Sequence, residues 1–262
     1  MNIVVTIKQV EDPATPPSHM VLGASGKSVQ SVSGVPRVMN GYDANAVEEA
    51  LRLKEKHGGK VTVVSLGDSS ARNTLKRAIA MGADSCVLLS DPQWELLDSF
   101  GTATVLAAAI RKIGNVDLVL CGRQASDSDA GQVLYWLAEM REFPVASPIV
   151  KIEESSADAL VVHSLLEEEY QRLSVKLPAL LGISSEINEP RQPSPKGTVT
   201  ATRTMVPTWN AAALAVGPLT CKVDMTKLEI QIRTGKAELI EGADGAARGR
   251  ALADKLHQLE LL

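Results

Sequence analysis

The amino-acid sequence predicts an α/β fold built on a parallel, Rossmann-like sheet, and three features indicate it. Short apolar runs and helical patterns alternate four times between residues 3 and 141, as in parallel strands joined by helices. The first run, residues 3–7, is apolar or β-branched throughout, as expected for a strand covered on both faces. The 262 residues, 45% of them hydrophobic and 22% charged, are enough for a sizeable core.

The elements of this core follow from apolar periodicity and from turn residues. A stretch rich in Pro, Gly and Ser, residues 13–34, is predicted as a loop or hairpin before the first helix. Glycines close the first two helices, as helix stop signals do. Strands are predicted at 3–7, 61–65, 85–89 and 116–121, and helices at 44–53, 71–81, 98–113 and 129–141.

The pattern changes after Pro144, where strands follow one another without helices. Alternating polar and apolar residues predict antiparallel pairing with one solvated face. These added strands are predicted at 149–152, 159–164, 168–175 and 179–183. Residues 192–209 look like a loop, and a terminal helix is predicted at 245–262. Apolar positions after 204 are too sparse for a core of their own, so we predict a nucleotide-binding core over 1–204 and a C-terminal arm over 205–262.

Composition excludes several classes of function. The net charge of −4 and the scattered basic residues give no electrostatic case for nucleic acid. No apolar run approaches the roughly 20 residues that cross a bilayer, and no signal peptide is recognisable, so we expect a cytoplasmic protein without membrane insertion. The three cysteines form no CxxC pair, which disfavours a redox dithiol or a zinc ribbon.

Three predicted strand ends carry small or polar residues, and ligands bind at the carboxyl ends of parallel strands. These ends are Ile7–Lys8, Ser65–Gly67 and Cys121–Gln124. The segment from Gln124 to Val133 then leads into a helix, whose free N–H groups can seat a phosphate. The alternative is an ordinary polar loop with its N-cap among residues 127–129. Three such ends at one sheet edge favour a nucleotide site.

No catalytic constellation is recognisable. The chain lacks the P-loop, the dinucleotide-binding glycine pattern and the nucleophile elbow. Its four histidines are far apart, and the adjacent carboxylates of residues 167–169 would point to opposite faces of a strand. We therefore expect no metal site and no catalytic residue.

Taken together, these segments resemble the β subunit of electron transfer flavoproteins. The resemblance runs through MNIVVTIKQV, Asn40-Gly41-Tyr42-Asp43 with AVEEALRLKE, VTVVSLG, TLKRAIAMGAD, CGRQASDSDAGQV, KLPALLGIS and NEPR, and covers about residues 1–191. It implies a fold of the adenine-nucleotide α-hydrolase-like type and a heterodimer with a homologous α subunit. It implies an FAD held mainly by the α subunit, and AMP or, in electron-bifurcating members, a second FAD in the β subunit. The expected role is to accept electrons from a dehydrogenase and pass them to the respiratory chain or another acceptor, without turnover of its own.

The resemblance also implies which residues contact the nucleotide. Lys8 and Arg123 are the nearby cations, and one of them is expected to offset phosphate charge. Where the family has Pro, this chain has Gly41, and where it has Gly at the helix start, this chain has Leu134, whose side chain would narrow the seat and favour AMP. The CGRQ motif at residues 121–124 resembles that of the electron-bifurcating members and favours a second FAD instead. The expected cofactor-binding residues are Ile7, Lys8, Asn40, Asp43, Ser65, Leu66, Gly67, Cys121, Gly122, Arg123, Gln124, Asp127, Ser128, Asp129, Ala130, Gly131, Gln132 and Val133.

A second departure concerns the electron donor. The family's docking loop carries an exposed Leu and a basic cluster, whereas this chain has Pro195 at the Leu position and the basic cluster is reduced to Arg203. We therefore expect a specialised dehydrogenase. The alternative function is an adenine-nucleotide-binding enzyme or a stress-type nucleotide-binding module on the same fold, but neither an SGGxDS-type loop nor a glycine triad for phosphate is present.

Overall fold

The computed structural model describes residues 1–262 except 24, 33, 168, 231–234 and 236. The chain forms two compact units, residues 1–228 and 229–262, and each is described by itself. The helices are α1 (Gly41–His57), α2 (Ala71–Met81), α3 (Ser99–Ile113), α4 (Val133–Arg141), α5 (Pro195–Arg203), α6 (Ala211–Leu214) and α7 (Gly245–Gln258), with 3-10 turns η1 (Pro17–His19), η2 (Pro92–Trp94) and η3 (Ser185–Ile187).

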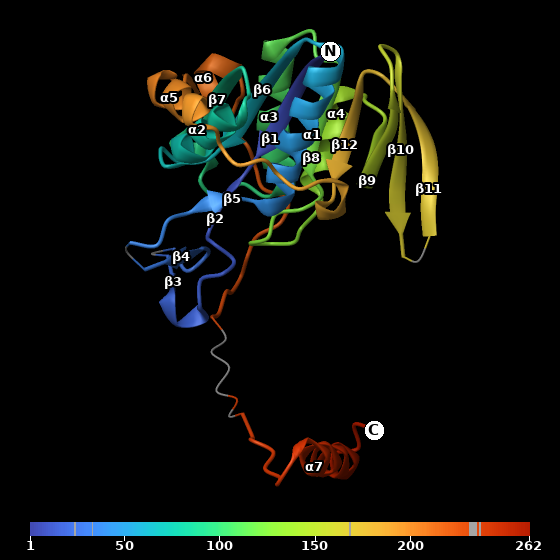
Figure 1. Ribbon diagram of the computed structural model, residues 1–262. Coiled ribbons are helices and arrows are strands. Elements are labelled where there is room, and N and C mark those ends of the chain that lie inside the picture. The colour runs from blue at the N-terminus through green and yellow to red at the C-terminus, as the bar shows by residue number, and fades with distance from the viewer. Residues whose placement is uncertain (24, 33, 168, 231–234, 236) are drawn as a thin grey trace. The chain divides into compact units, whose positions relative to one another are not determined.

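Over the described residues, the central sheet has nine strands in the order β11-β10-β9-β12-β8-β1-β6-β7-β13. Figure 1 shows β9, β10 and β11 at one end of this sheet and β7 near the other. The strands are β1 (Asn2–Ile7), β6 (Lys60–Leu66), β7 (Ser85–Leu89), β8 (Leu118–Gly122), β9 (Val145–Ser155), β10 (Ala159–Leu166), β11 (Glu169–Lys176), β12 (Ala179–Ile183) and β13 (Thr208–Trp209). Two small antiparallel sheets pair β2 (Gln9–Val10) with β5 (Val38–Met39) and β3 (Met20–Leu22) with β4 (Val29–Ser31).

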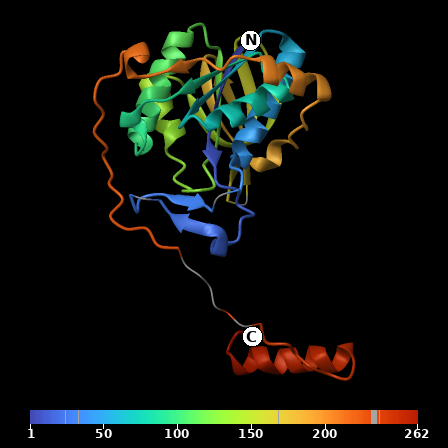
Figure 2. The same ribbon diagram turned by 90° about the vertical axis from the view of Figure 1, so that its left-hand side faces the viewer.

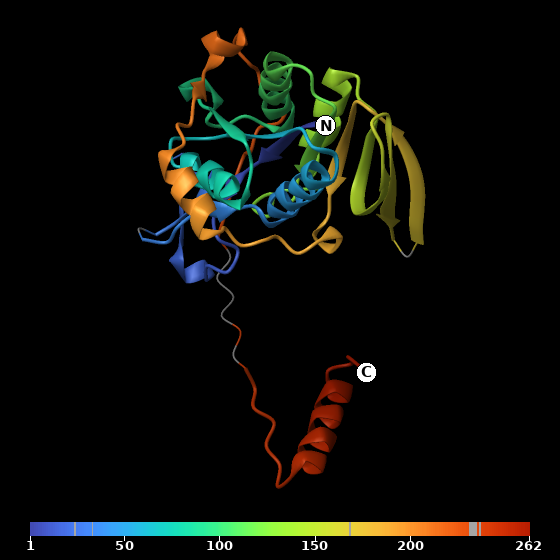
Figure 3. The ribbon, with the colours of Figure 1, turned by 45° about the horizontal axis from the view of Figure 1, so that its top comes forward.

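Helices cover both faces of the sheet, which confirms the predicted α/β class. Alternate residues of β1 pack to opposite sides, because side chains along a strand alternate. Val5 belongs to the core under α1 and α2, and Val4 to the core under α3 and α4. Figure 3 shows α1 and α2, in blue and teal, on one side of the sheet and α3 and α4, in green, on the other.

The direction of the chain reverses at β1. After β1 the chain adds β6 and then β7 on one side, and α3 then carries it back to β8 on the other side. All these neighbours are parallel. The loops that follow β1 and β8 therefore leave in opposite directions from adjacent strand ends. This topological switch point is where open α/β sheets bind ligands.

The predicted antiparallel pairing is correct for β9, β10 and β11 but wrong for the last of the four added strands. β12 lies between β8 and β9 and is parallel to both. Each of its residues is buried. The unbroken apolar run Ala179–Ile183 is typical of a strand covered on both faces, so the signal was in the sequence.

The predicted loop after residue 191 contains a helix, α5. Ser194 caps it by accepting a hydrogen bond from Gly197 N at 3.0 Å, and Pro195 occupies its first turn, where a missing N–H is harmless. A Cβ on Gly197 would lie 2.1 Å from Ala80 O of α2. The glycine therefore permits α5 to pack closely on α2.

Residues 205–228, which the sequence analysis places in the arm, belong to the first compact unit. β13 adds the last strand to the sheet beside β7. The Asp98 carboxylate accepts hydrogen bonds from the backbone N–H groups of Lys222 and Val223. Val206, Ala211 and Leu214 are buried in the core of this unit, so backbone pairing, these contacts and apolar packing together hold the stretch in place. The second unit contains α7, none of whose residues is buried.

A buried carboxylate ties the segment after η3 to α1. The Glu48 side chain, 4% exposed, accepts hydrogen bonds from Arg191 Nε at 2.7 Å and from Arg52 Nε at 2.8 Å. Burial raises the pKa of Glu48, but the hydrogen bonds from Arg191 and Arg52 outweigh it, so the pKa lies below 4.5. The stabilisation is therefore present above the unfolded pKa and is lost as pH falls through the folded one.

Arg191→Ala is expected to lower the free energy of unfolding by about 1–3 kcal/mol, because Glu48 loses a charge-assisted partner while buried. Urea denaturation at neutral pH measures this loss, which should shrink in acid as Glu48 is protonated. Arg172→Ala removes an exposed ion pair with Glu153 and should change little. Equal effects of the two substitutions would contradict the assignment.

Candidate functional site

The candidate site lies at the switch point, where the loops after β1 and β8 meet the start of α1 (Figure 1). Register places Thr6 of β1 opposite Cys121 of β8, so the two strands end side by side. The predicted residues 7–8, 40–43 and 121–133 come together here.

Asp43, in the first turn of α1, joins the two strand ends. Its Oδ2 accepts a hydrogen bond from Lys8 N at 2.6 Å, and its Oδ1 accepts one from Gly122 N at 3.1 Å. The residue is 5% exposed. Burial raises the pKa of Asp43 to about 7, against the lowering effect of hydrogen bonds from Lys8 N, the Asn40 side chain and Gly122 N and of the nearby Lys8 charge.

Gly122 is required by this arrangement. A Cβ there would lie 2.2 Å from Asp43 Oδ1 and 2.8 Å from Tyr42 Cβ. Any larger residue would therefore push α1 away from the end of β8.

Asn40 holds the loop that follows β8. Its Nδ2 donates to Gln124 O at 2.8 Å, and its Oδ1 accepts from Ser126 N at 3.2 Å. Its own backbone N donates to Lys8 O at 3.0 Å. Although Asn40 is the N-cap residue of α1, its side chain makes no cap hydrogen bond to that helix. The side chain is instead committed to the loop.

The loop ends at the N-terminus of α4 with free donors. Gln132, the N-cap residue, makes no side-chain cap hydrogen bond. Among the described residues, none of the backbone N–H groups of residues 130–133 donates to another backbone group. Asp129 and Gly131 have φ values of 48° and 59°, the left-handed conformation that occurs in backbone anion-binding loops. This geometry fits a phosphate.

The two predicted cations are placed differently. Lys8 Nζ forms an ion pair with Asp127 at 2.6 Å, which links the loops after β1 and β8. The Arg123 guanidinium lies over the Tyr42 ring at 5.3 Å, and its backbone N donates to Ile183 O. Gln124 and Asp129 are joined by a 2.9 Å hydrogen bond within the loop. Sequence reasoning missed the role of Tyr42, for which a cation–π partner gives no local signal.

The third predicted strand end, Ser65–Gly67, follows the neighbouring β6. Ser65 pairs with Ile7 across the sheet, is fully buried, and its Oγ has no hydrogen-bond partner in the described chain. Gly67 N donates to Leu89 O at 3.0 Å, so this end is anchored to β7. Cys121 is buried, and burial raises the pKa of its thiol to about 12. It is an inert core residue at neutral pH.

The Leu134 side chain does not point into the candidate phosphate site, contrary to the sequence-based expectation. It is 2% exposed and belongs to the core under α3 and α4. Its Cδ1 would lie 3.3 Å from a Cβ on Gly182 of β12. At the second helical position a side chain can point into the core while its backbone faces the loop, so Leu134 no longer argues for the smaller nucleotide.

Gly41→Pro is expected to raise the free energy of unfolding by about 0.4–1 kcal/mol, by restricting the unfolded chain. Gly41 is the first residue of α1, where Pro is favoured, and a Cβ there has nothing within 4 Å. Asn40, with ψ of 134°, already has the extended backbone that precedes Pro. Thermal denaturation measures the gain, and a lower midpoint would show that the turn needs glycine.

The region between β2 and β5 packs against the loop after β6. Arg37 joins Glu11, with Nε 2.7 Å from Oε1, to Asp68, with Nη1 2.9 Å from Oδ2. Gln9 and Ser70 exchange two further hydrogen bonds. Figure 2 shows this hairpin region, in blue, beyond the end of the central strands. No sequence signal singled out Arg37.

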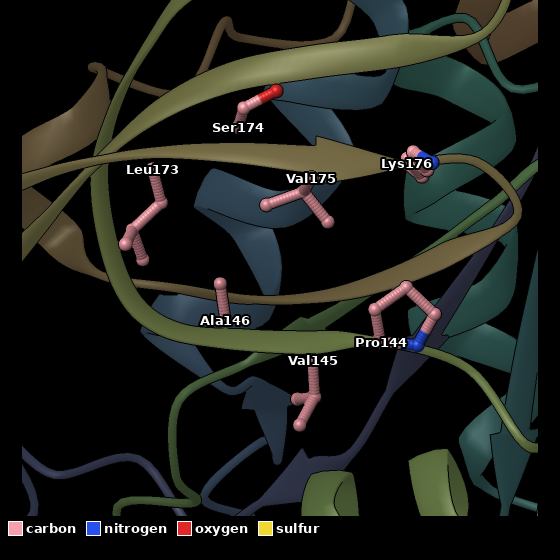
Figure 4. A pocket seen from close by; sticks show the side chains of 7 residues that line it. All are labelled: Pro144, Val145, Ala146, Leu173, Ser174, Val175 and Lys176. Carbon is pink, nitrogen blue, oxygen red and sulfur yellow. The ribbon is translucent and has the colours of Figure 1, made fainter.

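A hollow of about 630 Å³ lies away from the switch point (Figure 4). In the figure, Leu173 and Val175 of β11 face Ala146 of β9. The sheet order separates it from β1 and β8 by β12. Its walls carry no cluster of polar groups, so we do not assign it to the nucleotide. It is lined by Pro144, Val145, Ala146, Leu173, Ser174, Val175 and Lys176.

No described helix combines the length and the apolar character needed to cross a bilayer.

Comparison with known proteins places this chain in a family. The electron transfer flavoprotein domain family matches residues 29–214. The electron transfer flavoprotein subunit beta of Thermoanaerobacterium thermosaccharolyticum is 43% identical over 197 residues, 75% of this chain and 73% of the relative. The subunit of the same name from Megasphaera elsdenii is 36% identical over 228 residues, 82% and 80% of the two chains. Subunit CarD of the caffeyl-CoA reductase-Etf complex of Acetobacterium woodii is 33% identical over 270 aligned residues, all of both chains.

Proposed function

The chain belongs to the electron transfer flavoprotein family as a β subunit, and from this premise we propose that it binds an adenine nucleotide at the switch point and pairs with an α subunit that holds most of an FAD. The flavin supplies the electron transfer. This chain supplies the nucleotide seat and a protein surface, and it performs no turnover of its own.

The observation that carries the nucleotide is the uncapped N-terminus of α4 with the free N–H groups of residues 130–133. Such a group of donors stabilises a phosphate through direct hydrogen bonds and the helix dipole. Ser128 and Gln132 lie along the same exposed loop. Lys8 and Arg123 border it, although Lys8 is already paired with Asp127. The loop therefore binds phosphate mainly through its backbone.

Two nucleotides fit this seat. AMP needs one phosphate position, and a second FAD needs room for a pyrophosphate. The burial of Leu134 leaves the start of α4 open to the larger group. The sequence CGRQ at residues 121–124 also favours the second FAD, whereas the scarcity of aromatic residues, 3% of the chain, favours AMP.

The experiment is to purify the chain together with its α subunit, denature the complex, and analyse what is released. One FAD with one AMP per heterodimer supports the AMP form, and two FAD support the second-flavin form. One FAD and nothing else would refute a nucleotide site in this chain.

We propose that α5 takes part in docking the electron-donating dehydrogenase. It replaces the exposed loop that typical members use, and it presents Val199, 51% exposed, between Lys196 and Arg203. An apolar side chain with flanking cations suits a partner with an acidic rim around an apolar pocket. The relative CarD is named as part of a caffeyl-CoA reductase complex, in keeping with a specialised dehydrogenase here.

A further inference from the structure

We propose that Asp43 and Asn40 are positioning residues, which fix the loop after β8 in the form that seats phosphate, and that neither side chain contacts the nucleotide. The inference rests on the proposed function. Residues at the start of α1 would thus influence nucleotide affinity by holding the loop after β8, without touching the nucleotide.

Both side chains are buried and hydrogen-bonded to backbone groups of the protein. Asn40 is 1% exposed and Asp43 is 5% exposed. Each oxygen of Asp43 accepts from a backbone N–H, one from the end of β1 and one from the end of β8. Asn40 uses its amide nitrogen and its amide oxygen on the loop. With so little of either residue exposed, neither the carboxamide nor the carboxylate presents a surface to a ligand.

The hydrogen bonds of Asp43 and Asn40 hold the two parts of the site whose relative position matters, the paired strand ends and the loop after β8. Asp43 sets the distance between the ends of β1 and β8 across the switch point. Asn40 fixes residues 124–126, from which the loop continues to the N–H groups of residues 130–133. Loss of either clamp would leave these N–H groups disordered before binding, and ordering them would then reduce affinity.

The two clamps differ in how they respond to pH. The Asn40 carboxamide does not titrate, whereas a protonated Asp43 would lose its acceptor toward one of the two N–H groups. Burial places the pKa of Asp43 at about 7. The Lys8 charge and the Asn40 amide lower the pKa of Asp43. The charge of Asp43 in turn raises the pKa of the Cys121 thiol in β8. Arg123 lies at the same strand end, where its charge acts on Glu186 and its guanidinium stacks over the Tyr42 ring.

Because this folded pKa lies above the unfolded value of 3.8, protonated Asp43 favours folding. That contribution is full below the unfolded pKa and is lost as pH rises through about 7. Stability and nucleotide affinity should therefore depend on pH in opposite directions, which a merely structural residue would not produce.

The test compares Asp43→Asn, Asn40→Ala and Glu49→Gln in the complex with the α subunit. The probe is AMP, added after the bound nucleotide is removed, or FAD where the complex releases two. Glu49 is the matched control, because it is a buried carboxylate of the same helix with a raised pKa, held by Asn188 away from the loop. Affinity is measured one pH unit below and one above neutrality, together with the thermal midpoint.

We expect Asp43→Asn to bind about tenfold more weakly than wild type on the alkaline side, the equivalent of one hydrogen bond to a charged acceptor, and almost equally on the acid side. Asn40→Ala should lose affinity at both pH values. Glu49→Gln should keep the wild-type affinity and pH profile. The thermal midpoint of Asp43→Asn should not fall, because a buried charge is removed.

The phosphate of the probe titrates equally in every variant, so only differences between variants report on Asp43. An Asp43→Asn complex with the wild-type affinity and pH profile overturns the inference. A wild-type complex that holds no nucleotide at all overturns the proposed function instead.

Discussion

Deletion of residues 229–262 is expected to abolish association with the α subunit while the remaining unit stays folded. The deleted unit contains α7, in which no residue is buried. Leu252 of α7 and Leu259, which directly follows the helix, are 46% and 55% exposed, and the spacing of residues 252, 256 and 259 places three leucines on one side. Such an apolar side needs a partner, and each leucine contributes about 1.5–3 kcal/mol when covered. The loss corresponds to on the order of 10³-fold in affinity.

Co-purification of a tagged α subunit with the truncated chain measures this effect. A longer deletion, from residue 205, is the informative comparison. It removes β13, in which Trp209 O accepts a hydrogen bond from Ser90 N, and the preceding Pro207, whose O accepts one from Leu88 N. It should therefore lower the thermal midpoint of the core as well. A chain cut after residue 228 that still retains the α subunit would show that the last 34 residues bind elsewhere.

Gly122→Ala is expected to remove the nucleotide and to lower the free energy of unfolding by about 1–3 kcal/mol, the usual range for overpacking. The added methyl would overlap the Asp43 carboxylate and Tyr42, so the start of α1 must move from the end of β8. The bridge from Asp43 to Lys8 and Gly122 would then open, and the phosphate loop would lose its support.

Nucleotide released per complex and the thermal midpoint measure the two effects. Gly217→Ala is the matched control, because a Cβ at Gly217 has nothing within 4 Å. It should change neither quantity. A Gly122→Ala complex with a full complement of nucleotide would mean that α1 can shift without disturbing the loop.

The order of elements in the parallel core could be predicted because each one is marked locally. The ranges 71–81 and 85–89 coincide with α2 and β7, since glycine ends the helix and β-branched or apolar residues fill the strand. The position of β12 could not be predicted in this way. Periodicity describes a strand and its faces but not its neighbours, and after β11 the chain crosses back over two strands, β10 and β9, to place β12 beside β8.

The sequence predicted which segments form the candidate site, but not what each side chain does there. Strand ends and the loop into α4 follow from the rule for parallel sheets. That Asn40 and Asp43 point at backbone groups depends on how α1 enters the sheet, which spacing along the chain does not reveal. The same holds for Leu134. A shift of one residue along α4 decides whether a side chain faces the core or the candidate ligand site, and the sequence does not fix that shift.

The place of β12 also orders the events by which the chain becomes compact. β9, β10 and β11 can pair with one another as soon as they are made, since short turns connect them. They have no link to the parallel core until residues 179–183 emerge and fill the gap between β8 and β9. Until then two apolar strand edges stay open, the condition in which a nascent chain aggregates. Synthesis of β12 is thus the step at which the growing polypeptide can close both of these strand edges.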